Sequence, residues 1–365
     1  MYKVMMLVDN VEHGGVASAA TSMYTAVNEH SDDIVIDFIV YEEPKPETRE
    51  KYAANGSKIF VIPSVGAHPA AYMKRVYKIL KENGPYTAIH MHTAYFIWLA
   101  AKAAKKAGVP NRVGHGHGSK GKSKSRIFDM LAAVGRRMNR KYCTKMFACA
   151  EKSGRWTFGK DFEFLPNLIF PDNLCAEKND GYYDEFGIGR DTKVIGYYGV
   201  FEIEKNAAFV SDIMASFKDE NVVCIAAGSG SMFDIATERT KQLGVESKIK
   251  YIGYRKDGYG LMRFFDVLVV PSFSEGMSLS ILEAQMTGTP CVVSAGVPLT
   301  NDLQMGIYHV VPDYDPENWR KALLDALHEQ CSLSVSERIE HLSKIGYDSK
   351  SVADKLIDSY LRHRS

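Results

Sequence analysis

The 365-residue chain lacks the features that would place it in several special classes of protein. No stretch approaches the roughly 20 uninterrupted apolar residues that a membrane span needs, and the chain has no repeat of solenoid period and no low-complexity tract. The six cysteines have no CxxC spacing, so we expect free thiols in a reducing compartment, without disulfides or a zinc site. A net charge of +1 argues against bulk binding of nucleic acid. The first apolar run is too short for a secretory signal, which favours a cytoplasmic protein.

Short apolar runs rich in Val, Ile and Phe alternate with helix-like stretches along most of the chain. This alternation predicts an α/β fold, in which parallel sheets are connected by crossover helices. The expected strands are residues 3–9, 34–41, 57–63, 88–92, 111–116 and 146–150 in the first half, and 193–200, 221–228, 249–254, 266–272, 289–294 and 309–314 in the second. The expected helices include residues 69–83, 96–107, 206–217 and 233–243.

Proline, asparagine, aspartate and glycine concentrate between residues 166 and 191, where the hydrophobic periodicity lapses. We therefore place a linker near Pro166 to Asp172. Two Rossmann-like doubly wound domains are expected, one over residues 1–168 and one over residues 172–347, each long enough to bury a core of its own. A last amphipathic helix, residues 350–365, is expected to pack back on the first domain.

The segment PSFSEGMSLSILEAQMTGTP follows a predicted strand and should form a loop and then a helix. Ligands of such sheets bind beyond the carboxyl ends of the strands, where a helix N-terminus offers N–H groups to phosphate. Glu275 and Glu283 lie roughly 10 Å apart, at a rise of about 1.5 Å per residue, which is too far for an acid/base couple. They suit the two ends of an extended ligand whose diphosphate lies between them. Spacing alone is equally consistent with an alternative in which neither residue binds a ligand. In that case Glu283 is a solvated helix residue and Glu275 only complements the helix dipole.

Several short motifs follow one another along nearly the whole chain: GGVA, HMHTAYF, HGHGSK, LPNLI, GVFEIEKNAAF, AAGSGS, YIGYR and SFSEGMSLSILEAQMTGTPCVVS. Together they resemble the retaining glycosyltransferases of family four, in which Glu275 and Glu283 would form the Glu-x7-Glu motif. The resemblance implies a GT-B fold, with two Rossmann-like domains facing a central cleft. It also implies transfer of a sugar from a UDP-linked donor to a saccharide or polyprenyl-diphosphate-linked acceptor in surface polysaccharide synthesis, with retention and without metal or cofactor.

By the same resemblance, the second domain holds the donor. Glu283 would bind the ribose hydroxyls, Glu275 the transferred sugar and Lys205 the diphosphate, which makes Glu275 and Lys205 candidate catalytic residues. Further donor-binding candidates are Gly15, Gly199, Gly228, Arg255, Gly276, Met277, Ser278 and Leu279. Gly14, after the first strand, would let the backbone approach the acceptor, or would serve only as a turn.

The chain departs from the family pattern at Val200, because an arginine usually stands five residues before the lysine. A leaving diphosphate develops charge, so the loss of this arginine weakens catalysis unless Arg255 or a backbone N–H group replaces it. A non-catalytic nucleotide-sugar-binding subunit therefore remains an alternative. A nucleotide-sugar epimerase shares the architecture, but the glycine turn and the Glu275 to Glu283 block fit a transferase better.

Four histidines follow two neighbouring predicted strands. His92, His115 and His117 are candidates for the acceptor side, and the resemblance makes His117 the first choice for a catalytic contact with the transferred sugar. The spacing i, i+2 places His90 with His92, and His115 with His117, on one face of a strand. No further ligand is evident for either pair, so we expect no metal site.

Basic residues concentrate between Lys120 and Lys145. The group begins in a Gly/Ser/Lys loop that holds Lys120, Lys122 and Lys124, and it continues along a predicted helix whose apolar face includes Leu131. In the family that the chain resembles, such features dock the enzyme on anionic membranes near lipid-linked acceptors. We therefore hypothesise peripheral contact with the inner face of the plasma membrane, with a solvated basic helix as the equal alternative.

Overall fold

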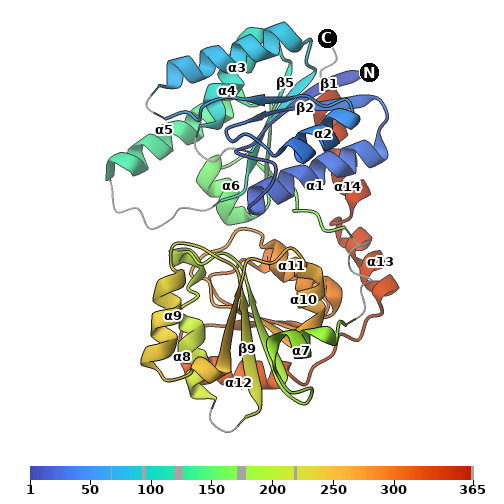
Figure 1. Ribbon diagram of the computed structural model, residues 1–365. Coiled ribbons are helices and arrows are strands. Elements are labelled where there is room, and N and C mark those ends of the chain that lie inside the picture. The colour runs from blue at the N-terminus through green and yellow to red at the C-terminus, as the bar shows by residue number, and fades with distance from the viewer. Residues whose placement is uncertain (67, 93–95, 119–125, 171–177, 218–219, 363–365) are drawn as a thin grey trace. The chain divides into compact units, whose positions relative to one another are not determined.

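The computed structural model describes residues 1–66, 68–92, 96–118, 126–170, 178–217 and 220–362, without the side chains of residues 126–129. The chain forms two compact units (Figure 1). Unit 1 comprises Met1–Leu168 and Gly346–Ser365, and unit 2 comprises Ile169–Ile345. The sequence predicted one domain over residues 1–168 together with the helix 350–365, and a second over residues 172–347. These limits lie close to the limits of the two units. Residues 171 and 172 of the expected linker lie outside the described part of the chain.

Unit 1 contains a sheet of seven parallel strands in the order β3-β2-β1-β4-β5-β6-β7. The order reverses between β1 and β4, the point at which sheets of this kind bind ligands. The strands are β1 (Tyr2–Leu7), β2 (Ile34–Val40), β3 (Ile59–Val61), β4 (Ala88–Met91), β5 (Asn111–Gly116), β6 (Lys145–Ala148) and β7 (Glu163–Phe164). Of these seven strands, only β7 was not predicted from the sequence, because two residues are too few to show a hydrophobic pattern.

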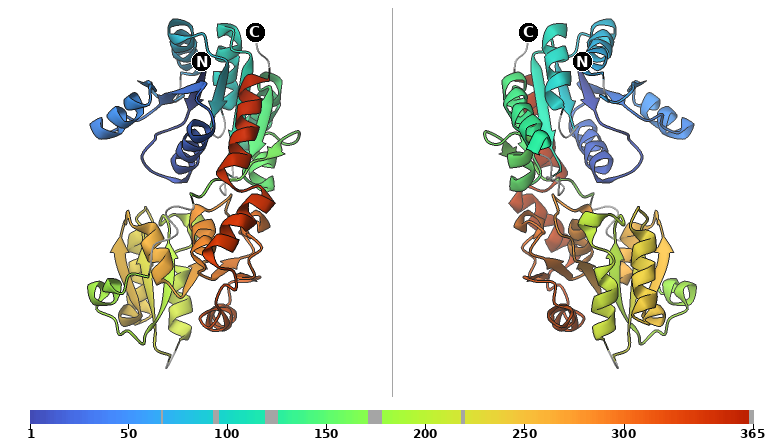
Figure 2. Two further views of the ribbon diagram at one scale, coloured as in Figure 1. Left: turned by 90° about the vertical axis from the view of Figure 1, so that its right-hand side faces the viewer. Right: turned by 90° about the vertical axis from the view of Figure 1, so that its left-hand side faces the viewer.

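Helices cover both faces of this sheet, which explains why its strands read as continuous apolar runs (Figures 1 and 2). One face packs against α1 (Gly15–His30) and α14 (Ser349–Leu361), and the other against α3 (Pro69–Asn83) and α4 (Ile97–Ala107). The remaining helices are α2 (Pro46–Ala54), α5 (Arg126–Tyr142) and α6 (Glu151–Thr157).

The helix α14 belongs to the core of unit 1 although it lies at the end of the chain. Its residues Val352, Ala353, Leu356 and Tyr360 are buried in the same cluster as Val4 of β1. These positions recur at helical spacing, so one face of α14 is apolar. Burial of this face holds the last helix on the first sheet.

Unit 2 repeats the same topology, with six parallel strands in the order β10-β9-β8-β11-β12-β13. Its switch point lies between β8 and β11. The strands are β8 (Lys193–Tyr198), β9 (Val222–Ala227), β10 (Ile249–Gly253), β11 (Val267–Val270), β12 (Cys291–Ser294) and β13 (Tyr308–Val311). The helices are α7 (Gly181–Phe186), α8 (Phe209–Ser216), α9 (Phe233–Gln242), α10 (Gly258–Phe264), α11 (Leu279–Thr287), α12 (Pro316–Ala326) and α13 (Val335–Ile345), with a short 3-10 turn, η2 (Ile203–Lys205). The predicted α/β fold with two doubly wound parallel sheets is confirmed.

The segment between residues 166 and 191 differs from the sequence interpretation, because it contains the helix α7. Tyr182, Tyr183 and Phe186 of this helix are buried and their rings pack around Phe264 of α10. A helix of six residues is too short for its apolar spacing to stand out among flanking prolines and glycines.

Candidate functional site

Lys205 and Glu275 form an ion pair at the switch point of the second sheet. Lys205 follows β8 and Glu275 follows β11, and these two strands are neighbours. The Lys205 ammonium donates to both carboxylate oxygens of Glu275, at 2.7 and 2.5 Å. The glutamate is only 6% exposed, whereas the lysine is 28% exposed. The structure thus brings together two of the candidates that the sequence singled out.

Two hydrogen bonds fix the loop that carries Lys205 against the loop that carries Glu275. The amide of Phe273 donates to the carbonyl of Glu204 at 2.8 Å, and the Asn206 side chain donates to the carbonyl of Pro271 at 3.2 Å. Asn206 has a φ of 52°, in the left-handed region that asparagine tolerates better than most residues. The position of the lysine therefore depends on its neighbours on both sides.

Glu275 is also held by polar groups that sequence analysis did not select. The Ser272 hydroxyl donates to its carboxylate at 2.7 Å, and its own amide donates to the carbonyl of Gly296 at 3.3 Å. A Cβ on Gly296 would lie 2.5 Å from the carbonyl oxygen of Phe273, so this position requires glycine. Gly296 belongs to the loop after β12, and no local spacing in the sequence points to this support.

Asn301 caps the helix α11 from outside. Its side-chain oxygen accepts from the amide of Ser278 at 2.6 Å, and its side-chain nitrogen donates to the carbonyl of Gly276 at 2.9 Å. Asn301 is fully buried, and its carbonyl accepts from Gln285 of α11 at 2.7 Å. These hydrogen bonds hold the loop that is proposed to meet the diphosphate, which includes Met277 and leads to Leu279.

Glu283 is the fifth residue of α11, about one turn beyond the start of the helix. Burial raises the pKa of its carboxyl to about 7, although a hydrogen bond from Tyr259 opposes this effect. Burial, and after it the charge of Glu283, raises the pKa of the neighbouring Tyr198 to about 12. A carboxylate in this environment is poorly solvated, so hydroxyl groups of a ligand can replace the missing water.

Gly199 and Gly228 meet where the loops after β8 and β9 cross. Gly228 has a φ of 142°, and a Cβ there would lie 1.8 Å from the carbonyl oxygen of Gly199. Gly199 is more open, since its own Cβ would meet only the Tyr197 hydroxyl, at 3.9 Å. Val200 follows with a side chain that is 48% exposed. Both predicted glycines therefore lie at the carboxyl ends of central strands.

Arg255 is engaged by carboxylates of its own unit. It donates to both oxygens of Asp257, at 2.8 and 2.6 Å, and to Glu185 at 2.5 Å. The hydrogen bond from Arg255 lowers the pKa of Asp257 to about 2. Two negative charges already surround this guanidinium, which weakens the idea that Arg255 replaces the arginine missing at position 200.

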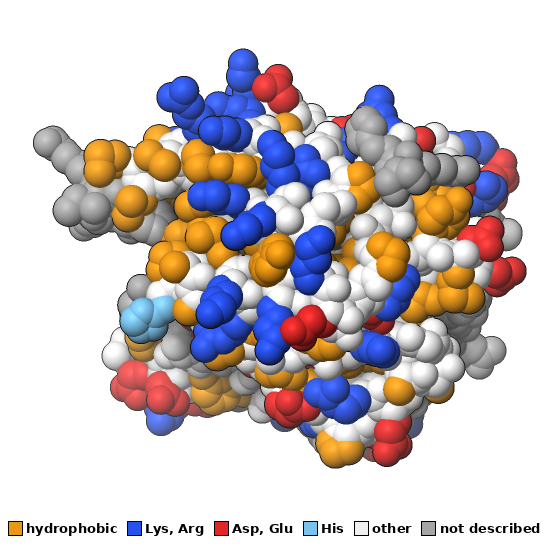
Figure 3. Space-filling view, turned by 90° about the horizontal axis from the view of Figure 1, so that it is seen from above, with side chains coloured by type: hydrophobic (Ala, Val, Ile, Leu, Met, Phe, Trp, Pro, Cys, Tyr) orange, Lys and Arg blue, Asp and Glu red, His pale blue; other side chains and the backbone are white. Residues whose placement is uncertain are grey.

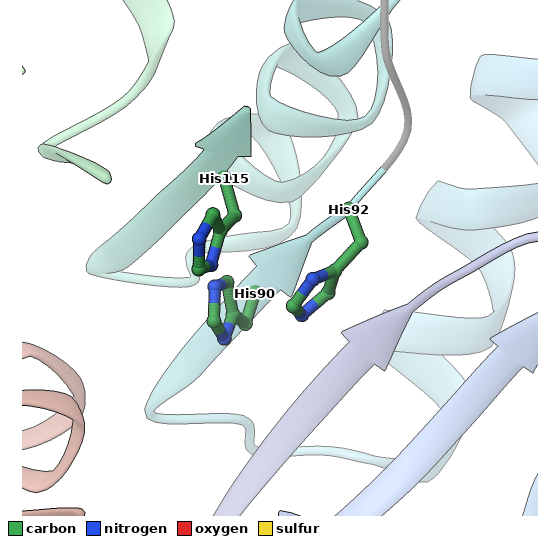
Figure 4. Close-up of side chains that lie close together, drawn as sticks. All are labelled: His90, His92 and His115. Atoms are coloured by element: carbon green, nitrogen blue, oxygen red, sulfur yellow. The ribbon is translucent and has the colours of Figure 1, made fainter. Parts of the chain in front are cut away.

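The four histidines of unit 1 form one buried cluster. His90 pairs with Val113 across β4 and β5, and the same parallel register brings His92 opposite His115 on the same face. Ring centroids are 4.1 Å apart for His90 and His92, and 4.2 Å for His115 and His117. Figure 4 shows the rings of His90, His92 and His115 converging from the two strands. The expectation that neither pair of histidines has further ligands nearby is therefore wrong. The alignment of β4 with β5 brings the two pairs together.

Burial keeps these rings neutral. It lowers the pKa of His90 to about 3 and that of His117 to about 4, and it holds the pKa values of His92 and His115 well below their usual range. His90 and His115 are fully buried and His92 is 3% exposed, whereas His117 is only partly buried. Exposure thus favours His117 over His92 and His115 as the residue that touches a ligand.

Gly14 is the N-cap of α1 and Gly15 is its first residue, and a loop of six residues separates them from β1. Gly14 has a φ of 88°, and nothing within 4 Å would obstruct a Cβ at either position. Gly14 is thus required for its backbone conformation, and the space above Gly15 is open to a ligand.

No helix in the described ranges is long and apolar enough to cross a membrane. Residues 182–349 match the model of the family described as glycosyl transferases group 1. A protein of Bacillus subtilis (strain 168) named as a glycosyltransferase, EpsF, is 28% identical over 98% of this chain and 96% of its own length. The Escherichia coli UDP-Gal:alpha-D-GlcNAc-diphosphoundecaprenol alpha-1,3-galactosyltransferase is 28% identical over 60% of each chain.

Solved structures show the same fold. Anabaena Alr3699/HepE, in complex with UDP and glucose, superposes with a TM-score of 0.80 over 100% of both chains at 14% identity. WaaG, a glycosyltransferase involved in lipopolysaccharide biosynthesis, gives a TM-score of 0.71 at 17% identity over 99% of this chain and 100% of its own. The expected GT-B fold and the resemblance to family four are confirmed. Residues 182–349 therefore match the glycosyl transferases group 1 family, and the chain as a whole has the GT-B fold of known glycosyltransferases.

Proposed function

We propose that this glycosyltransferase takes its sugar from a UDP-linked donor bound by unit 2. The observation that carries the proposal is the Lys205–Glu275 pair at the switch point, with Glu283 farther along α11. Glu283 is proposed to accept hydrogen bonds from the ribose hydroxyls, and the loop before Leu279 to bind the diphosphate. The support from relatives is that HepE binds UDP and glucose, and that the E. coli enzyme is named for UDP-Gal.

We propose that Lys205 changes its anionic partner from Glu275 to the diphosphate when the donor binds. The ammonium of Lys205 neutralises the buried carboxylate of Glu275. A bound diphosphate offers Lys205 a second anion, and the carboxylate of Glu275 is then free to accept a hydrogen bond from the transferred sugar. Lysine thereby supplies positive charge where the leaving group develops negative charge, without Mg²⁺ or Mn²⁺.

The proposed reaction retains the configuration at the sugar C1. The bond between C1 and the β-phosphate oxygen breaks, and its electron pair leaves with UDP. The acceptor hydroxyl oxygen bonds to C1 on the same face, and its proton passes to the departing phosphate. No protein nucleophile takes part, and we propose that His117 of unit 1 contacts the transferred sugar.

We propose a saccharide or lipid-linked saccharide as the acceptor, in the synthesis of a surface polysaccharide. The support is the E. coli relative, which is named for a GlcNAc-diphosphoundecaprenol acceptor. A chain that meets such acceptors works at a membrane surface, so we propose cytoplasmic residence with peripheral contact to an anionic bilayer.

The helix α5 offers features that suit this contact. Leu131 and Val134 are 59% and 53% exposed, and Arg137 of the same helix is exposed. A neighbouring apolar pocket of about 170 Å³ is lined by Phe96, Trp98, Leu131, Ala132, Val134, Gly135, Arg136, Asn139, Trp156 and Thr157. Figure 3 shows Lys and Arg side chains gathered over one face of unit 1, with hydrophobic side chains at its left-hand end. Lys120, Lys122 and Lys124 lie outside the described residues.

A non-catalytic donor-binding subunit is the second candidate. The specific observation in its favour is Val200, for which Arg255 is a poor substitute because it is already paired with Asp257 and Glu185. Such a protein would bind UDP but transfer no sugar.

One experiment separates the two. Purified protein receives a panel of UDP-sugars with a lipid-linked acceptor, while calorimetry measures UDP binding. Transfer with retained anomeric configuration, unchanged when Mg²⁺ or Mn²⁺ is added after chelation, supports the enzyme. UDP binding with neither transfer nor donor hydrolysis supports the subunit. Glu275→Ala should mainly lower turnover and Glu283→Ala should mainly weaken UDP binding, and equal losses in both would contradict the assigned roles.

A further inference from the structure

The histidine cluster of unit 1 contains polar atoms that the sugar-transfer proposal does not use. Among the described residues, His90 Nε2, His92 Nε2 and both ring nitrogens of His115 are buried and have no hydrogen-bond partner. Nearly all buried polar groups in folded proteins have a partner, so four such nitrogens on three neighbouring histidines require a physical reason. A ligand that accepts their lone pairs would provide one.

Hydrogen bonds already orient two of the rings. His90 Nδ1 lies 2.8 Å from the Tyr360 hydroxyl of α14, and His92 Nδ1 lies 2.8 Å from His117 Nε2. When Nδ1 donates in these bonds, Nε2 carries the lone pair. Histidines that bind metals are held in the same way, with the second ring nitrogen donating to a neighbouring group.

We propose that His90, His92 and His115 bind one divalent transition-metal ion of the zinc class. One nitrogen from each ring lies within 4.8 Å of the others. Zinc binds imidazole at about 2.0–2.1 Å, so tetrahedral coordination requires nitrogens about 3.3 Å apart. Metal binding therefore requires the rings to turn so that these nitrogens come closer, and Figure 4 shows that the rings converge from adjacent strands.

The ligand set selects among metals. Three imidazoles suit zinc, copper, nickel and iron, whereas Mg²⁺ and Mn²⁺ prefer oxygen ligands. The site therefore differs in chemistry from a metal that would assist a diphosphate, and its ligands belong to unit 1. Its role is structural: the ion joins β4 to β5, and through His90 and Tyr360 it supports α14.

Zinc titration of the full chain tests the proposal directly. After removal of metals with a chelator, we expect calorimetry to show one Zn²⁺ per chain, and Co²⁺ to give the visible absorption band of a tetrahedral nitrogen site. Zinc at about 100 times its Kd should raise the Tm by roughly 5–10 °C. Mg²⁺ should do neither. Absence of saturable binding near one equivalent would overturn the proposal.

Variants separate a metal site from a merely buried cluster. His115→Leu removes a ligand together with two unpaired nitrogens, so the metal-free variant should be at least as stable as the wild type, while its zinc affinity falls at least 100-fold. His92→Gln provides a second ligand loss if His115→Leu does not fold. His328→Ala, at an exposed histidine of unit 2, should keep the full zinc response. If His115→Leu and His92→Gln both bound zinc with the affinity of the wild type, the proposal would be wrong.

Discussion

A buried charge is tolerated only with its partner, and this governs what can be changed at Lys205 and Glu275. The carboxylate of Glu275 lies almost out of solvent and accepts from Lys205 and from Ser272. Loss of one partner of such a pair leaves a desolvated charge, which is more damaging than loss of both. Stability and catalysis can therefore be tested with the same residues.

Lys205→Met should lower the free energy of unfolding by about 3 kcal/mol, because it leaves Glu275 charged and without its cation. Urea denaturation measures the loss. Adding Glu275→Gln should recover most of the stability without restoring sugar transfer. Lys193→Met is the control, since the Lys193–Asp266 pair is longer, at 3.6 Å, and more exposed, and its loss should change stability by less than about 1 kcal/mol. A stable, active Lys205→Met protein would contradict both the buried-pair argument and the proposed role of the lysine.

Glu283 makes stability depend on pH. Its folded pKa of about 7 lies above the ordinary value of 4.5, so the folded chain binds more protons between these values and stability falls as pH rises through them. The full loss above pH 7 is about 3 kcal/mol. Glu283→Gln should lack this decline. The stability of the variant relative to that of the wild type should therefore be higher at pH 8 than at pH 5.

The same substitution should weaken UDP binding, because a neutral amide accepts ribose hydroxyl protons less strongly than a carboxylate. In the wild type, UDP affinity should rise with pH through about 7, as the carboxyl ionises. Glu238→Gln, at an exposed position of α9, is the matched control for both measurements. A flat affinity profile in the wild type would remove Glu283 from the donor site.

At the scale of elements, the start of α11 shows how distant segments prepare a binding loop. Sequence reasoning finds the strand, the small-residue loop and the helix, because each has a local signature in the chain. It does not find the cap, because Asn301 is separated from Ser278 by 23 residues and reaches it only in the folded sheet. The helix N-terminus is thus organised by a buried side chain that no local pattern indicates.

Asn301→Ala should cost about 1–3 kcal/mol of stability, because it leaves the Ser278 amide and the Gly276 carbonyl without partners. It should also weaken UDP binding, since the loop loses its support. Asn301→Asp keeps the acceptor for the Ser278 amide but loses the donor to Gly276, so its effect on the loop should be intermediate. Thermal unfolding and UDP calorimetry measure both effects. A variant that loses stability yet binds UDP normally would show that the cap is only structural.

At the scale of the whole molecule, the proposed membrane contact uses residues of unit 1. Each cation near an anionic surface contributes about 1 kcal/mol, so replacing Lys120, Lys122 and Lys124 with glutamate should greatly reduce flotation with anionic vesicles. Leu131→Glu should reduce it further by removing an exposed apolar side chain of α5. Lys344→Glu, in α13 of unit 2, is the control. Unchanged vesicle binding in the lysine variant would favour a solvated basic helix.

The sequence alone determined the two parallel sheets and the identity of the donor-side candidates. Strands buried on both faces produce apolar runs, and these runs alternate regularly with the helices that pack on them. Both features can therefore be recognised in the sequence. The loop from Ser272 to Ser278 was equally legible, because small residues between a strand and a helix are typical of a turn where backbone approaches a ligand. The resemblance to the family indicated Lys205, and the strand–loop–helix segment also indicated Glu275.

Only the tertiary structure decided which of these residues meet. The pairing of Lys205 with Glu275 depends on β8 lying beside β11, and the union of His90 and His92 with His115 depends on the register of β4 against β5. Strand order and register are set by packing among segments far apart in the chain, and they leave no mark on local spacing. For the same reason, the sequence led us to expect no metal site, although the fold brings three imidazoles together.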